Sequence, residues 1–393
     1  MGNKIGKFFE NDNKSQPSPN TNKNIKNEKK TSTSNTQIDE KPIPYSFIPN
    51  SSTKNEEDKN FKCIRVIKGH KKWCNCLIIL QSNNLCSCSG DKSINIYSND
   101  KEYSVILRLS SCHDDFILYT TELYNSILAS CSSDGTIKFW KIILISNNLD
   151  DNKYYLIQTI VGHESDIWKI LFIREKNHLV SCGSDALIKI WNLNYIQNNN
   201  NTENERDIIE FEEFKILKEH QFWISSIIQV DNVEKDIKYL VSGSGDTNIK
   251  FYNINKDYLF VHTINKVLCC QQGTLVNYNN TKFLIGGGRG IFFYIVNFIN
   301  FQIETKIYGG CEEVNSILVL KNNKLIKNGG FLVGGKECSF HYVYENTFLI
   351  KTIKKKAHEK YIYCIIQLGD NLIASSSYDN EIKIWEYNEH LFE

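Results

Sequence analysis

Proline is scarce in this 393-residue chain, and its five prolines all lie within the first 49 residues. The same part of the chain, residues 1–59, is dense in Asn, Lys, Ser and Thr and has few apolar residues. Too little apolar surface is present there to offset the entropy cost of ordering the backbone. We therefore expect residues 1–59 to be a disordered tail and residues 60–393 to form the folded domain.

Long apolar runs are also missing, and neither sign of charge dominates. No stretch of about 18 consecutive apolar residues occurs, so no transmembrane helix is expected. The formal net charge is +1, which gives no electrostatic reason to expect a nucleic-acid partner. No N-terminal segment combines the basic, apolar and cleavage regions of a secretory signal, so we expect a cytoplasmic chain.

Common catalytic motifs are absent as well. The chain contains no GxxxxGK[ST], no GxSxG and no HExxH segment. The glycine-rich run at 286–290 is predicted to be a turn between strands rather than a dinucleotide-binding loop, because no helix follows it. We therefore expect a protein that is not an enzyme and that needs no cofactor.

The sequence does contain one frame that occurs five times. The segment from Gly162 to Trp191 starts with Gly-His and then alternates short runs rich in Ile, Val and Trp with polar turns, a pattern typical of short antiparallel strands. Its offsets, a His followed by Ser-x3-Asp-x5-aromatic, recur in four further units. The five sets are His70, Ser87, Asp91 and Tyr97; His113, Ser130, Asp134 and Trp140; His163, Ser181, Asp185 and Trp191; His220, Ser242, Asp246 and Tyr252; and His358, Ser375, Asp379 and Trp385.

Two weaker copies fill the gap between Tyr252 and His358. One has Gly288 in the place of the Asp and Tyr294 in the aromatic place, and the other has Lys336 and Tyr342 there. The chain thus resembles the WD-repeat family, whose repeats are about 40–45 residues long. The resemblance implies an all-β fold, a seven-bladed β-propeller with five well-formed repeats.

The resemblance also assigns a role to the repeated residues. In WD-repeat propellers the His, Ser, Asp and Trp of a repeat form a hydrogen-bonded chain, so the five sets are expected to be structural networks. A catalytic triad is the competing interpretation, but a catalytic set need occur only once. Because the last repeat ends at Trp385, we expect the segment 62–67, and Cys63–Ile67 within it, to supply the fourth strand of the last blade and close the ring.

Many propellers bind partners on the face that holds the Asp turns, which we call the top face. The residues just before the first strand of each blade, and two places further, are expected at the rim of the central channel, where large aromatics can anchor an interface. Packing between blades is the alternative role for some of them. The expected partner-binding residues are Trp73, Phe116, Asp166, Trp168, Trp223, Glu313, Tyr361 and Tyr363.

The resulting prediction is a scaffold or adaptor that binds other proteins or peptides within a larger complex. A second interpretation is a substrate receptor of a ubiquitin ligase, although only five arginines are available to recognise a phosphorylated segment. A third is an adaptor tethered peripherally to a membrane by myristate on Gly2. The start MGNKIGKFF offers that glycine, a small Gly6 and nearby lysines; an unmodified start is the alternative.

Cysteine usage and two insertions complete the sequence prediction. Of the 13 cysteines, Cys88, Cys131 and Cys182 share one repeat position and are expected to be small buried residues. No disulfide is expected in a reducing compartment. No metal site is expected, because the Cys-x-Cys pairs near residues 74–88 lack the usual ligand spacing. The insertions at 141–153 and 192–211 are expected to be solvated loops on the bottom face, with an acidic docking element as the alternative.

Overall fold

The computed structural model describes residues 61–124, 126–197, 207–233, 235–267, 273–279, 281–287, 292–310, 313–320, 330–336, 339–344, 350–354 and 356–388. The expected disordered tail, with Gly2, lies outside the described residues, as does Gly288. No helix in the described ranges is long and apolar enough to cross a membrane.

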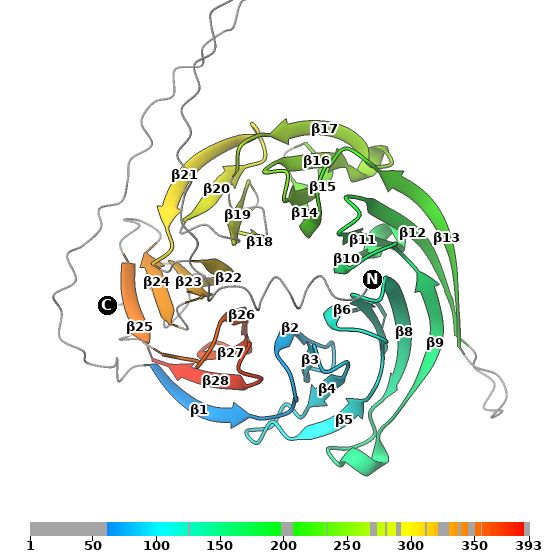
Figure 1. The fold of residues 1–393 in the computed structure, drawn as a ribbon, viewed down its shortest axis with the longest axis vertical. Helices are drawn as coiled ribbons and strands as arrows, with labels where there is room; N and C mark the ends of the chain where they lie inside the picture. The colour runs from blue at the N-terminus through cyan, green and yellow to red at the C-terminus, as the bar shows by residue number, and fades with distance from the viewer. Residues whose placement is uncertain are drawn as a thin grey trace, which may run out of the picture. The chain divides into compact units, whose positions relative to one another are not determined.

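Seven four-stranded antiparallel sheets are arranged in a ring, each with its first strand toward the centre (Figure 1). Blade 1 contains β2 (Cys74–Ile79), β3 (Leu85–Ser89), β4 (Ile94–Tyr97) and β5 (Val105–Leu109). Blade 2 contains β6 (Ile117–Glu122), β7 (Ile127–Ser132), β8 (Thr136–Ile143) and β9 (Lys153–Val161). Blade 3 contains β10 (Ile167–Ile173), β11 (His178–Gly183), β12 (Ile188–Ile196) and β13 (Ile208–Leu217). Blade 4 contains β14 (Ile224–Asn232), β15 (Ile237–Ser244), β16 (Ile249–Asn253) and β17 (Leu259–Ile264).

The two weak repeats also form complete blades. Blade 5 contains β18 (Gly273–Asn277), β19 (Lys282–Gly287), β20 (Phe292–Asn297) and β21 (Gln302–Tyr308). Blade 6 contains β22 (Val314–Leu320), β23 (Gly330–Gly335), β24 (Phe340–Tyr344) and β25 (Ile350–Lys354). Blade 7 contains β26 (Ile362–Gln367), β27 (Leu372–Ser377) and β28 (Ile382–Tyr387), with β1 (Phe61–Ile67) as its outer strand. The predicted seven-bladed β-propeller is confirmed.

The second strands of the blades are buried on both faces, because each blade is sandwiched between two others. Every residue of β7 and of β11 is buried, so these strands need small or apolar side chains on both faces rather than an alternating pattern. Cys88, Cys131 and Cys182 are 0% exposed. The Cys131 thiol lies 3.3 Å from the carbonyl oxygen of Ile167 in the next blade, which leaves room for little more than a small side chain.

The two ends of the propeller sequence meet in blade 7. Strand β1 runs antiparallel to β28 over its whole length, with Phe61 opposite Tyr387 and Ile67 opposite Ile382. Phe61 is 2% exposed and stacks on Trp385, with ring centroids 5.2 Å apart. It also meets Phe340 of blade 6 edge-on at 5.5 Å. The first strand of the described chain is therefore part of the last blade and of its contact with the blade before.

The repeated polar residues lie within hydrogen-bonding distance in each of the five well-formed blades. In blade 3, His163 Nδ1 lies 2.8 Å from Asp185 Oδ2, and Nε2 lies 2.8 Å from Ser181 Oγ. The indole N–H of Trp191 donates to the same Ser181 hydroxyl at 3.0 Å. The His163 side chain is 0% exposed, so the network joins the entry loop, the second strand, the Asp turn and the third strand inside the blade.

The His–Ser and His–Asp contacts recur in the other four sets, whereas the hydroxyl of Tyr252 in blade 4 lacks a hydrogen-bond partner among the described residues. The distances from the His ring to the carboxylate are 3.2, 3.0, 2.7 and 2.9 Å in blades 1, 2, 4 and 7. Burial raises the pKa of each Asp, but the hydrogen bond to the His ring, the electrostatic contribution of that ring and hydrogen bonds from backbone N–H groups together outweigh it. The pKa of Asp185 is therefore lowered, and that of Asp379 falls to about 2. The carboxylates are thus held in their charged form by buried partners.

One expectation about the insertions was wrong. The segment 192–211 was expected to be a solvated loop, but β12 continues to Ile196 and β13 begins at Ile208. Most of the described part of this insertion therefore lengthens a hairpin. In the smaller insertion, β8 ends at Ile143 and β9 begins at Lys153, so that residues 144–152 connect the two strands.

Removing β1 should destabilise the whole propeller. A chain that starts at Asp58 keeps β1 and should melt like the full-length protein, whereas one that starts at Lys71 leaves the edge of β28 bare and should lose a cooperative transition. Phe61→Ala, a milder change, should lower the free energy of unfolding by about 3–5 kcal/mol. Thermal and urea unfolding measure both effects; identical curves for all three lengths would contradict ring closure by β1.

Removing one network carboxylate should cost more stability than removing a side chain from the corresponding place in a weak repeat. Asp185→Ala leaves Nδ1 of the buried His163 ring without its carboxylate partner, a loss of about 1–3 kcal/mol. Lys336→Ala removes a part-exposed ion pair with Glu313 and a contact between the ammonium and the Tyr361 ring, each worth under about 1 kcal/mol. Urea denaturation of the two variants compares them directly. A loss for Lys336→Ala as large as that for Asp185→Ala would contradict the structural role of the network.

Candidate protein-binding face

The top face is built from equivalent positions in six blades. Trp73, Phe116, Asp166, Trp223, Glu313 and Tyr361 each directly precede the first strand of a blade, and all are part-buried. The backbone carbonyl of each accepts a hydrogen bond from an amide of the Asp turn in the same blade, over 2.9–3.2 Å. The same backbone contact therefore places six different side chains at corresponding points around the channel.

Three of these side chains belong to one continuous row of rings. Tyr361 meets Tyr378 with centroids 6.3 Å apart, and Tyr378 stacks on Trp73 at 4.9 Å with an interplanar angle of 7°. Trp73 then meets Phe116 edge-on at 4.9 Å. These four residues, which we call the aromatic row, cross from blade 7 over blade 1 to blade 2. Tyr363 packs against Tyr378 at 6.1 Å, and burial raises its pKa.

The sequence prediction missed Tyr378, which joins the row. Tyr378 directly precedes Asp379 in the turn of blade 7, where blades 1 and 4 have Gly90 and Gly245. A Cβ added at Gly90 would lie 2.6 Å from the indole of Trp73, so glycine lets that indole lie flat over its own blade. The only sequence signal for Tyr378 was a large aromatic in a turn position that otherwise holds a small residue.

Lysines accompany the aromatic row. The Lys72 ammonium lies 5.0 Å from the ring centroid of Phe116 and 5.8 Å from that of Trp73. Lys360 lies 5.2 Å from the ring of Tyr378. Cations over ring faces are attracted by the π-electrons, and both lysines remain exposed. The row therefore presents aromatic surface bordered by positive charge.

The remaining predicted residues form separate groups. Trp168 donates its indole N–H to Ser184 Oγ at 2.8 Å, and that hydroxyl lies 3.2 Å from Asp166. Burial raises the pKa of Asp166, against hydrogen bonds that lower it, and the charge of Asp115 adds to the increase. Blade 3 thus carries a polar, acidic group rather than a continuation of the row.

The last two positions differ again. Trp223 lies over Gly245 and meets the ring of Phe222 at 5.9 Å. Phe222 is 53% exposed and was not predicted. Glu313 pairs with Lys336 at 3.4 Å, and that ammonium lies 5.8 Å from the ring of Tyr361. The structure therefore brings Trp73, Phe116, Tyr361 and Tyr363 together and leaves Trp223 and Trp168 apart.

The His–Ser–Asp sets have the residue types of a hydrolase triad but not the access. Ser181 is 0% exposed and its hydroxyl is occupied by both His163 and Trp191. A substrate carbonyl has no path to such an oxygen, and the other four serines of the sets are equally buried. Among the described residues, no group of three or more His, Cys, Asp or Glu is arranged to hold a metal ion.

Comparison with known proteins agrees with the repeat pattern. The pattern described as "WD domain, G-beta repeat" matches residues 61–98, 107–141, 154–192 and 349–386. The matches start at the outer strand of one blade and end in the third strand of the next. The repeat of blade 4, well formed in the sequence, and the two weak repeats fall outside these four ranges.

Individual relatives are similar over part of their length. The protein transport protein SEC13 of Debaryomyces hansenii is 33% identical over 89 residues, which cover 22% of this chain and 28% of the relative. Nuclear distribution protein nudF 1 of Talaromyces marneffei is 31% identical over 131 residues, which cover 32% of this chain and 26% of the relative. This chain thus spans between a quarter and a third of each relative's length. The WD-repeat pattern thus matches four repeats of a chain whose described residues form a seven-bladed β-propeller.

Proposed function

We propose that this propeller is a non-catalytic scaffold in the cytoplasm that binds other proteins or peptides through the aromatic row on its top face. The observation that carries the proposal is the row itself, in which Tyr361, Tyr378, Trp73 and Phe116 form one surface across three blades. Aromatic side chains with a polar atom anchor protein interfaces because they bury large areas at little entropy cost.

The charged side chains around the aromatic row indicate which kind of partner segment would bind there. The exposed ammonium groups of Lys72 and Lys360 border the row, while Asp166 marks an acidic group over blade 3. A partner segment with carboxylates over blades 7 and 1 would complement this distribution, and complementary charge raises the rate and specificity of association. The repeated networks beneath the top face hold the rings in fixed positions and reduce the ordering cost of binding.

Reversing the charge beside the row should remove partners without unfolding the protein. Lys72→Glu with Lys360→Glu changes two exposed side chains and should reduce the recovery of co-purifying proteins at least about tenfold. A matched control, Lys62→Glu with Lys235→Glu, changes two exposed lysines elsewhere and should leave recovery unchanged. Quantitative mass spectrometry of affinity-purified full-length chains measures both. Equal recovery with the two double variants would contradict a binding role for this side of the top face.

A tethered form of the same scaffold is the second candidate, and the sequence MGNKIGK supports it. Gly2 is available for myristoylation once Met1 is removed. A single myristoyl chain binds membranes weakly, and nearby lysines strengthen the contact with anionic lipid.

Gly2→Ala should shift the protein from the membrane fraction to the soluble fraction, since it removes only the acceptor of the lipid. Replacing Lys4, Lys7 and Lys14 by Gln should weaken membrane binding while leaving acylation intact, and high salt should mimic that change. Membrane fractionation, with the intact mass of the N-terminal peptide, checks both effects. An unacylated N-terminus, together with equal solubility of wild type and Gly2→Ala, would leave the untethered scaffold as the function.

A further inference from the structure

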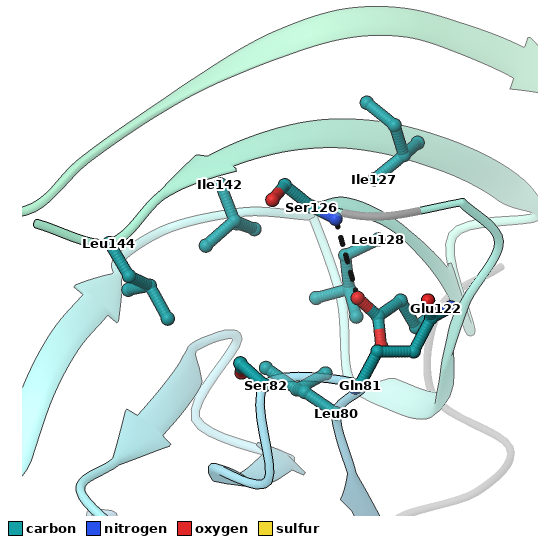
Figure 2. A pocket seen from close by; sticks show the side chains of 9 residues that line it. All are labelled: Leu80, Gln81, Ser82, Glu122, Ser126, Ile127, Leu128, Ile142 and Leu144. Atoms are coloured by element: carbon teal, nitrogen blue, oxygen red, sulfur yellow. Dashed lines mark hydrogen bonds between the residues drawn. The ribbon is translucent and has the colours of Figure 1, made fainter.

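A pocket of about 330 Å³ opens between blades 1 and 2 (Figure 2). Its walls come from the turns after β2 and β6 and from the end of β8, which lie at the opposite ends of the strands from the Asp turns. The pocket therefore belongs to the bottom face and is separate from the aromatic row. Its apolar lining residues are Leu80, Ile127, Leu128, Ile142 and Leu144.

A carboxylate lies in the wall of this pocket, beside the polar residues Gln81, Ser82 and Ser126. Glu122 accepts a hydrogen bond from the backbone N–H of Gln81 in blade 1 at 2.6 Å, and another from that of Ser126 at 3.3 Å (Figure 2). These bonds hold the side chain across the junction of the two blades. They place a negative charge beside the leucine and isoleucine side chains.

The loop next to the pocket has a defined shape. Residues 144–152 follow β8, and Leu144 is shared between the loop and the pocket wall. Asn152 is 7% exposed, and its side chain donates to the carbonyl oxygens of Ile106 at 2.8 Å, Ser146 at 2.8 Å and Asn148 at 3.0 Å. Its Oδ1 accepts the N–H of Ile145 at 2.6 Å. One buried amide therefore ties the loop to itself and to blade 1.

This loop exposes apolar and acidic side chains together. Ile145 is 69% and Leu149 is 47% exposed. Exposing these apolar side chains to water is unfavourable, and the hydrogen bonds that shape the loop do not require it. Asp150 and Asp151 are exposed in the same turn. The side-chain amide of Asn147 donates a hydrogen bond to the carboxylate of Asp100 in blade 1, over 3.3 Å. Lys141 and Lys153 flank the loop in sequence, and Lys101 follows Asp100. Because the Lys141 ammonium is paired with Asp207 at 2.9 Å, the carboxylates of Asp100, Asp150, Asp151 and Glu122 outnumber the remaining two ammonium groups.

We propose that the pocket and the loop form a second docking site, for a basic amphipathic segment of a partner protein. An apolar side chain of that segment fills the space between Leu80, Leu128 and Ile142. Its neighbours pack on Ile145 and Leu149, and its lysines or arginines face Asp150, Asp151 and Glu122. Charge complementarity selects this occupant over an acidic segment. The site goes beyond the scaffold function proposed for the top face and does not depend on it.

Fluorescence anisotropy on the full-length chain tests the site with two labelled peptides, acetyl-LKKLLKKL-amide and its acidic counterpart acetyl-LEELLEEL-amide. The basic peptide should bind at least tenfold more tightly than the acidic one. Ile145→Ser with Leu149→Ser, which alters exposed side chains, should weaken the basic peptide at least tenfold. Ser82→Phe, which puts a large ring at the pocket wall, should do the same.

Two controls separate this site from the rest of the surface. Val161→Ser with Val233→Ser removes apolar side chains that are 80% and 68% exposed elsewhere and should leave the affinity unchanged. The top-face variant Lys72→Glu with Lys360→Glu should also bind the basic peptide normally, whether or not the top-face proposal holds. Equal affinity for the two peptides, no binding of either, or unchanged binding by the Ile145 and Leu149 double variant would overturn the proposal.

Discussion

The pairing of β1 with β28 is the constraint on which the rest of the propeller depends. An open ring would leave blade 7 with three strands and expose the backbone groups of β28 as an unpaired edge. Because β1 precedes blade 1 in the sequence and β28 belongs to blade 7, their pairing joins the first and the last strands of the ring. Phe61 then fills the space between Trp385 and Phe340, so closure also secures the contact between blades 6 and 7.

Within this closed ring the His–Ser–Asp networks join the entry loop, the second strand and the Asp turn in five of the blades. A part-buried carboxylate without partners would be costly, but each of the five contacts a His ring and accepts at least one backbone N–H. The turns are thereby fixed at the ends of the strands, on the face where Trp73 and Tyr361 lie. Blade 6 has Lys336 in the place of the Asp and uses an ion pair with Glu313 instead. The same turn position can therefore be held by different chemistry while the blade keeps its shape.

The sequence was sufficient to predict the blades because the repeat offsets are local. Each Ser, Asp and aromatic set lies within one short segment, so its spacing records a hairpin. Contacts between blades produce no comparable spacing pattern in the sequence. Tyr378 stacks on Trp73, far away in the sequence, and only ring closure brings the two together. Phe61 was just outside the segment singled out for closure, since a single aromatic before a strand has no periodic signal.

Less of the bottom face could be predicted from the sequence, because it too depends on contacts between different blades. The pocket between blades 1 and 2 combines Leu80 with Ile142, residues of two different repeats whose register is set by packing. The long hairpin of blade 3 was mistaken for a loop, because its outer strand is rich in charged residues such as Glu210 and Glu212. Such an edge strand needs few apolar residues when its outer side faces water.

Hydrogen exchange of the native protein tests the central claim, that the two ends of the folded domain close one ring, most directly. The amides of β1 that pair with β28 should exchange as slowly as those of β28 itself, because both should open only when the propeller unfolds as a whole. Fast exchange of the β1 amides beside protected amides in β27 and β28 would show that the ring is stable without its closing strand, and would contradict the account.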